Sequence, residues 1–114
     1  MASVSIPEDL AQAEQRAKEL QSRNIKTTVD AVIQQAITDY VQEILMEGLE
    51  GSYVTTHFAD DQLTITEDAT GKVLTTIPAP DGGFQAAFRS QGRMLMQNLA
   101  NKVQEKFRDR IIRG

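Results

Sequence analysis

The side chains that could perform acid–base chemistry are few in this sequence. The single histidine, His57, precedes Asp60-Asp61, and Glu67-Asp68 forms a second acidic pair. A histidine beside carboxylates can relay protons or hold a metal, but a protein metal site needs three or four ligands and a catalytic triad needs a nucleophile. There is no second histidine and no cysteine, and both acidic pairs lie at expected turns, where aspartate is favoured. We therefore expect no enzyme, no catalytic residue, no metal site and no cofactor.

Two glycine-containing segments could bind phosphate. Thr70-Gly71-Lys72 is similar to the end of a phosphate-binding loop, but the earlier glycine at the required spacing is missing. Gly82-Gly83 precedes a helical pattern whose first N–H groups could hold an anion. Helix initiation is the simpler interpretation of the second segment.

Two helices are expected in the first part of the chain. Pro7 with Glu8-Asp9 predicts a helix start, and Asn24 predicts the end of a helix over 7–23. Thr27 or Thr28 can cap a second helix over 28–47. That helix carries a wide apolar stripe that must face a core or a partner. Its members are Val29, Ile33, Ala36, Ile37, Tyr40, Val41, Ile44 and Leu45.

The middle of the chain predicts a three-stranded antiparallel meander. Residues 53–58, 62–67 and 72–77 are rich in threonine, valine and isoleucine and alternate with an approximate period of two. Gly71 suits a left-handed turn position, and Pro78 should end the sheet because proline cannot continue a ladder.

A long amphipathic helix is expected over 83–112. Its apolar residues recur at spacings of three or four, with one gap that contains Gly92. A helix of that length is long for a small domain, so it should protrude, break near Gly92 or pair with a second copy. The expected fold class is therefore α+β, in a single domain over 1–114.

Charge is distributed unevenly along the chain. Residues 1–48 hold eight acids and four bases, and residues 49–82 hold six acids and one base; residues 83–114 hold seven bases and two acids. The basic segment either binds a partner, such as DNA, an acidic protein or anionic lipid, or packs against the acidic remainder. The candidate partner-binding residues are Arg89, Arg93, Lys102, Lys106 and Arg110.

No secretory signal pattern begins the sequence, and no apolar run approaches the ~20 residues that a membrane span needs. We therefore expect a cytoplasmic protein.

Two segments of the first part of the chain form a recognisable pattern: Ser-Val-Ser-Ile-Pro-Glu-Asp-Leu at 3–10 and Thr-Val-Asp-Ala-Val-Ile-Gln-Gln-Ala-Ile-Thr-Asp-Tyr-Val at 28–41. Through them, residues 3–45 resemble the ribbon-helix-helix DNA-binding family of the CopG and Arc type. The resemblance implies a homodimer whose paired strands enter the major groove, while the start of the second helix holds a phosphate. The residues that it assigns to DNA contact are Ser3, Ser5, Lys26, Thr27 and Thr28.

Two functions follow as expectations. The first is a non-enzymatic, dimeric DNA-binding regulator of ribbon-helix-helix type. The alternative is a non-catalytic adaptor or assembly subunit that acts through protein–protein contacts, because surplus apolar surface usually marks a partner.

Overall fold

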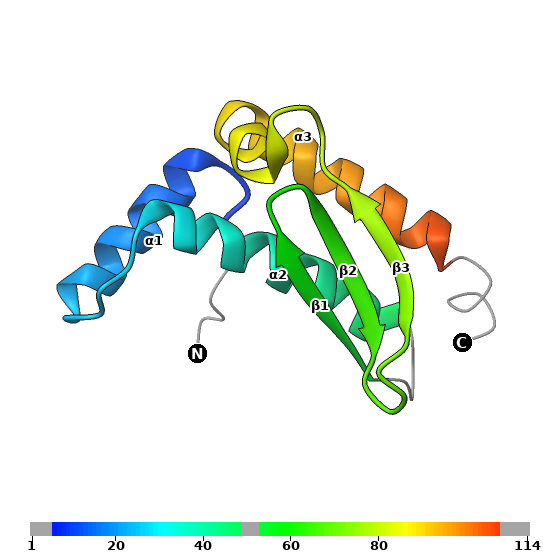
Figure 1. Cartoon of the computed structure of the whole chain (residues 1–114). Coiled ribbons are helices and arrows are strands. Elements are labelled where there is room, and N and C mark those ends of the chain that lie inside the picture. Colours follow the sequence, from blue (N-terminus) through cyan, green and yellow to red (C-terminus); the bar gives the residue numbers. More distant parts are fainter. Residues whose placement is uncertain (1–5, 49–52, 108–114) are drawn as a thin grey trace.

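The computed structural model describes residues 6–48 and 53–107 and has an α+β fold, as predicted (Figure 1). The elements follow one another as α1 (Leu10–Ser22), α2 (Val29–Gly48), β1 (Val54–Ala59), β2 (Gln62–Glu67), β3 (Val73–Pro78) and α3 (Gly83–Lys106). The helices α2 and α3 run behind the three-stranded sheet, and α1 packs beside α2 (Figure 1).

Helix α1 begins later than the sequence pattern predicts, because Asp9 is its cap and not part of its first turn. The Asp9 backbone is extended, and Asp9 Oδ1 accepts a hydrogen bond of 2.9 Å from the Gln12 N–H. At the other end, Asn24 has a positive φ of 62°. The Ile25 N–H turns back to the Leu20 carbonyl, which closes the helix in the Schellman manner. Asn24 is thus the terminator that the sequence predicts.

Helix α2 buries its apolar stripe within the same chain. Ile33, Ile37, Val41 and Leu45 are fully buried, and the flanking stripe residues pack against the same core. Of the two expected alternatives, a core or a partner, the stripe therefore faces the core of its own chain. Helix α3, which is distant in sequence, and the two elements adjacent in sequence, α1 and β1, supply its cover.

The sheet is an antiparallel meander in the order β1-β2-β3. Inward-facing side chains alternate with polar outward ones, so only one face of the sheet meets the helices. The predicted limits of β2 are confirmed, and β1 and β3 each lie one residue later than predicted. Pro78 is the last residue of β3, and Gly71 has the predicted positive φ, at 72°.

Helix α3 bends instead of protruding. Gln91 has non-helical backbone angles (φ −148°, ψ 62°), which confirms the predicted break beside Gly92. Lys106 is the last helical residue, so the helix ends before the predicted limit; residues 108–112 lie outside the described part of the chain. The bend lets both halves of α3 contribute to one core, through Phe84, Phe88, Leu95, Leu99 and Val103.

Gly92 sits where α3 crosses the start of α1. A Cβ atom at this position would lie 2.5 Å from the Glu8 carbonyl oxygen and 2.8 Å from the Asp9 Cα. Both atoms belong to backbone, so the close approach of the two helices requires glycine here.

No helix in the described ranges is both long enough and apolar enough to cross a membrane.

Candidate nucleic-acid interface

The residues that the resemblance assigns to DNA contact fall in two places. Lys26, Thr27 and Thr28 lie on the connection between α1 and α2. Ser3 and Ser5 lie outside the described residues.

The connection between α1 and α2 is held by hydrogen bonds that leave Lys26 exposed. Gln21 Nε2 on α1 donates to the Thr27 carbonyl oxygen over 2.9 Å. Thr28 Oγ1 accepts from the Ala31 N–H over 3.1 Å, so Thr28 is the cap of α2. The hydroxyl of Thr28 keeps its own proton, which it can still donate to an external oxygen.

Helix α3 brings a further cation to the start of α2. Arg89 Nη2 forms an ion pair with Asp30 Oδ1 in the first turn of α2. One turn earlier on α3, Gln85 Nε2 donates to the Asp30 carbonyl oxygen over 3.0 Å. Sequence reasoning placed Arg89 on a basic helix but could not place it here, because the two residues are 59 positions apart.

Three cations belong to the start of α2 and to the connection before it, although the chain as a whole is acidic. Arg23 and Lys26 are exposed before α2, and Arg89 reaches the first turn of α2 from α3. The carboxylates of Asp30 and Asp60 both contact that part of α3. Free N–H groups at a helix start, cations and hydroxyls are the groups that hold phosphate oxygens in protein–DNA complexes.

The other candidate partner-binding residues do not gather at one site. Arg93 Nε lies 3.2 Å from Asp9 Oδ2, so this arginine ties α3 to the cap of α1. Lys102 and Lys106 are exposed on the second half of α3 and form no ion pair with another described residue. Arg110 lies outside the described residues. For Arg89 and Arg93, packing of the basic helix against the acidic remainder is thus confirmed.

The residues considered for acid–base chemistry are dispersed or already engaged. His57 is exposed on the outward face of β1. Asp60, in the β1–β2 turn, accepts the Gln85 N–H over 2.8 Å, and its carbonyl accepts the Phe84 N–H over 2.9 Å. The anion at the start of α3 is therefore an internal carboxylate. Across the described ranges, no three residues of His, Asp or Glu gather as metal ligands would.

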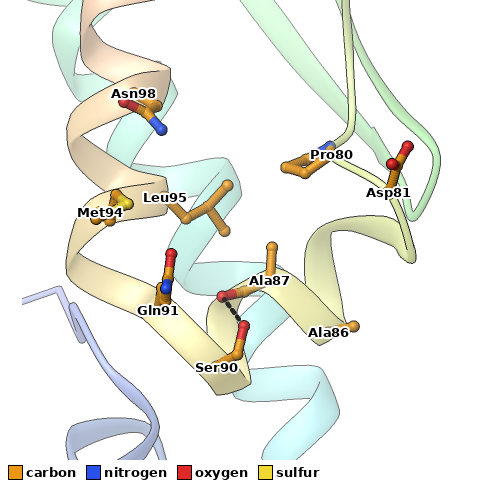
Figure 2. A pocket seen from close by; sticks show the side chains of 9 residues that line it. All are labelled: Pro80, Asp81, Ala86, Ala87, Ser90, Gln91, Met94, Leu95 and Asn98. Carbon is orange, nitrogen blue, oxygen red and sulfur yellow. Dashed lines mark hydrogen bonds between the residues drawn. The ribbon is translucent and has the colours of Figure 1, made fainter.

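A hollow of about 280 Å³ lies on the inner side of the α3 bend. Figure 2 shows Leu95, Ala87 and Pro80 directed toward the same space, with Ser90 Oγ bonded to the Ala87 carbonyl. Asp81 is the one titratable residue in its lining.

A second hollow, of about 340 Å³, lies between α1 and α2 beside the first described residues. Ile6, Leu20, Val32 and Ala36 make its apolar part, and the polar side chains around it are Arg16, Gln35 and Asp39.

Tyr40 lies on α2, one residue after Asp39 of this second hollow. Partial burial raises the pKa of its phenol above the usual value of 10.0, and the negative charges of Glu8 and Glu43 raise it further. Tyr40 is therefore a neutral hydrogen-bonding group at physiological pH and no base.

Comparison with known proteins returns no relative: no protein-family model, curated protein or solved structure matches the chain. What the interface can bind must follow from its own residues.

Proposed function

We propose that this protein is a non-enzymatic DNA-binding regulator that grips the phosphate backbone at the start of α2 and acts as a homodimer. One observation carries the proposal: exposed Arg23 and Lys26 precede the Thr27-Thr28 start of α2, and Arg89 reaches its first turn from α3, where Asp30 and Asp60 are the opposing charges. Neutralising phosphates supplies most of the affinity of a protein for DNA without sequence preference. A local cluster can therefore bind a duplex even when the net charge of the chain is −4.

The dimeric part of the proposal is supported by the hollow between α1 and α2. This hollow combines an apolar floor with a cation, Arg16, and an anion, Asp39. In a two-fold symmetric dimer the same patch of each copy meets itself, so Arg16 of one copy can face Asp39 of the other. The ribbon-helix-helix resemblance places the two-fold axis at residues directly before Ile6.

The proposal is tested with the full-length protein and a short mixed-sequence DNA duplex. We expect a dimer in sedimentation, and binding in fluorescence anisotropy that weakens steeply as salt is raised. The substitution Lys26→Gln should weaken binding and reduce the slope of log affinity against log salt by about 1.

The matched control is Lys72→Gln, an exposed lysine in the β2–β3 connection, far from α2's start (Figure 1). It changes the net charge equally and should leave the affinity nearly unchanged. Equal effects of the two substitutions, or no binding at low salt, would contradict the proposed interface.

An adaptor or assembly subunit is the second candidate, favoured by the outward face of the sheet. Tyr53 is 70% exposed and Val73 is 54% exposed. The register sets Thr55 and Val73 on either side of Thr66, so all three lie in one row of this face. Apolar groups on an uncovered face suit a protein partner. An oligomer in sedimentation that is indifferent to DNA would favour this function over the first.

A further inference from the structure

Helix α3 forms one ion pair with the start of α1, Arg93–Asp9, and one with the start of α2, Arg89–Asp30. The two carboxylates have different roles. Asp9 is needed locally: its Oδ1 caps α1 and its Oδ2 meets Arg93, and its side chain is only 31% exposed. Asp30 does not cap a helix, because Thr28 is the cap of α2. The Asp30 side chain is 64% exposed, and its carboxylate meets Arg89 at the surface.

Arg89 is positioned by more than this pair. It lies one turn after Gln85, whose side-chain amide is anchored to the Asp30 backbone over 3.0 Å. The α3 segment therefore stays at the start of α2 if the Asp30 carboxylate releases the guanidinium. The Arg89 side chain is 43% exposed, so an external oxygen anion can reach it.

We propose that the Asp30 carboxylate is an internal substitute for a DNA phosphate, which holds Arg89 in place until the duplex takes it over. This inference rests on the proposed function and adds to it a phosphate contact from α3, outside the segment that resembles ribbon-helix-helix proteins. Exposed ion pairs are weak, whereas arginine binds phosphate with two parallel hydrogen bonds. The exchange leaves Asp30 unpaired near the duplex, so the same carboxylate also restrains binding by repulsion.

The test compares four full-length proteins on the same mixed-sequence duplex: the wild type, Arg89→Gln, Asp30→Asn and the double variant. We expect Arg89→Gln to lower the affinity by roughly three- to tenfold and to reduce the salt slope by about 1, the signature of a lost phosphate contact. Asp30→Asn should raise the affinity, because it frees Arg89. In the double variant most of that gain should be lost, and only the part that comes from relieved repulsion should remain.

Further variants and folding measurements separate this contact from a general effect of charge or folding. Arg93→Gln removes an arginine of the same helix that is paired with Asp9 at the start of α1. Because Arg93 does not contact the start of α2, this substitution should change the affinity for DNA by less than about twofold. Circular dichroism and thermal unfolding of each variant report whether the fold is kept. Arg89→Lys keeps the charge and loses the paired donors, so it should recover only part of the affinity.

Three results would overturn the inference. If the gain from Asp30→Asn persists in full without Arg89, Asp30 acts by general repulsion alone. If Lys26→Gln weakens binding and Arg89→Gln does not, the interface stands but α3 takes no part in it. If the wild type does not bind DNA at low salt, the proposed function fails and this inference fails with it.

Discussion

Gly92 shows how a single residue sets the angle between two helices. In most helix interiors glycine is a weakness, and alanine is more favourable by about 1 kcal/mol. Here the space for a methyl group is occupied by the backbone of Glu8 and Asp9. Flexible side chains could move aside, but a helix start that is already tied to Arg93 cannot move without loss.

Gly92→Ala should therefore destabilise the protein, although helix propensity alone would predict that alanine stabilises it. We expect a loss of roughly 1–3 kcal/mol in the free energy of unfolding, as for other overpacked sites. Urea denaturation measures it. Ser90→Ala, at an exposed position two residues earlier, is the control and should be neutral or slightly stabilising. A stabilised Gly92→Ala protein would show that α1 does not pack here.

At the scale of elements, a side chain of α2 covers two outward backbone groups of the edge strand β1. Gln42 on α2 donates through Nε2 to the Val54 carbonyl over 2.5 Å, and its Oε1 accepts the Thr56 N–H over 3.1 Å. These are backbone groups of β1 that point away from β2. An open edge strand is a template for association with other chains, so its coverage protects the fold.

Gln42→Ala should lower stability and promote self-association. Loss of the amide leaves the Val54 carbonyl and the Thr56 N–H without their partner, which costs roughly 1–3 kcal/mol in the free energy of unfolding. Urea denaturation and light scattering at rising concentration are the measurements. Gln34→Ala, on the exposed side of α2, removes an amide of equal size. Indistinguishable behaviour of the two variants would argue against the edge contact.

Much of the element level follows from local sequence, because caps, turns and periodicity are local properties. Thr28 as a cap, Asn24 as a terminator and Gly71 at a positive φ are all predicted and observed. The contacts that build the candidate interface are different in kind. Arg89 with Asp30, like Gln42 with Val54, depends on how whole elements pack, and no periodicity encodes that choice. Sequence predicted the cations of α3 but not which of them would meet α2.

At the scale of the whole molecule, α3 connects the starts of the other helices. Arg93 meets the cap of α1, Arg89 meets the first turn of α2, and the start of α3 itself is bonded to Asp60 of the sheet. Each exposed ion pair contributes only ~0–1 kcal/mol, so these contacts orient more than they stabilise. The stabilisation comes from the buried face of α3.

A chain that ends at residue 82 should therefore fail to fold cooperatively. It lacks Phe84, Phe88, Leu95, Leu99 and Val103, all buried. At about 1.5–3 kcal/mol for each side chain, their loss is on the order of 10 kcal/mol, comparable to the whole stability of a small domain. Circular dichroism during thermal unfolding is the measurement. A sharp transition in the shortened chain would mean that residues 6–82 hold a core of their own.

Position 42 also restricts which chemical changes the sheet can tolerate. A primary amide presents a donor and an acceptor on one carbon, the same pair that a peptide group presents, so one side chain completes the ladder as a strand of one residue would. Glutamate, which differs from glutamine by one atom, offers acceptors alone and would turn a carboxylate oxygen toward the Val54 carbonyl. Hydrolysis of the Gln42 amide to a carboxylate during storage or ageing would thus break the hydrogen bond to the Val54 carbonyl and expose the edge of β1, without any change in the gene.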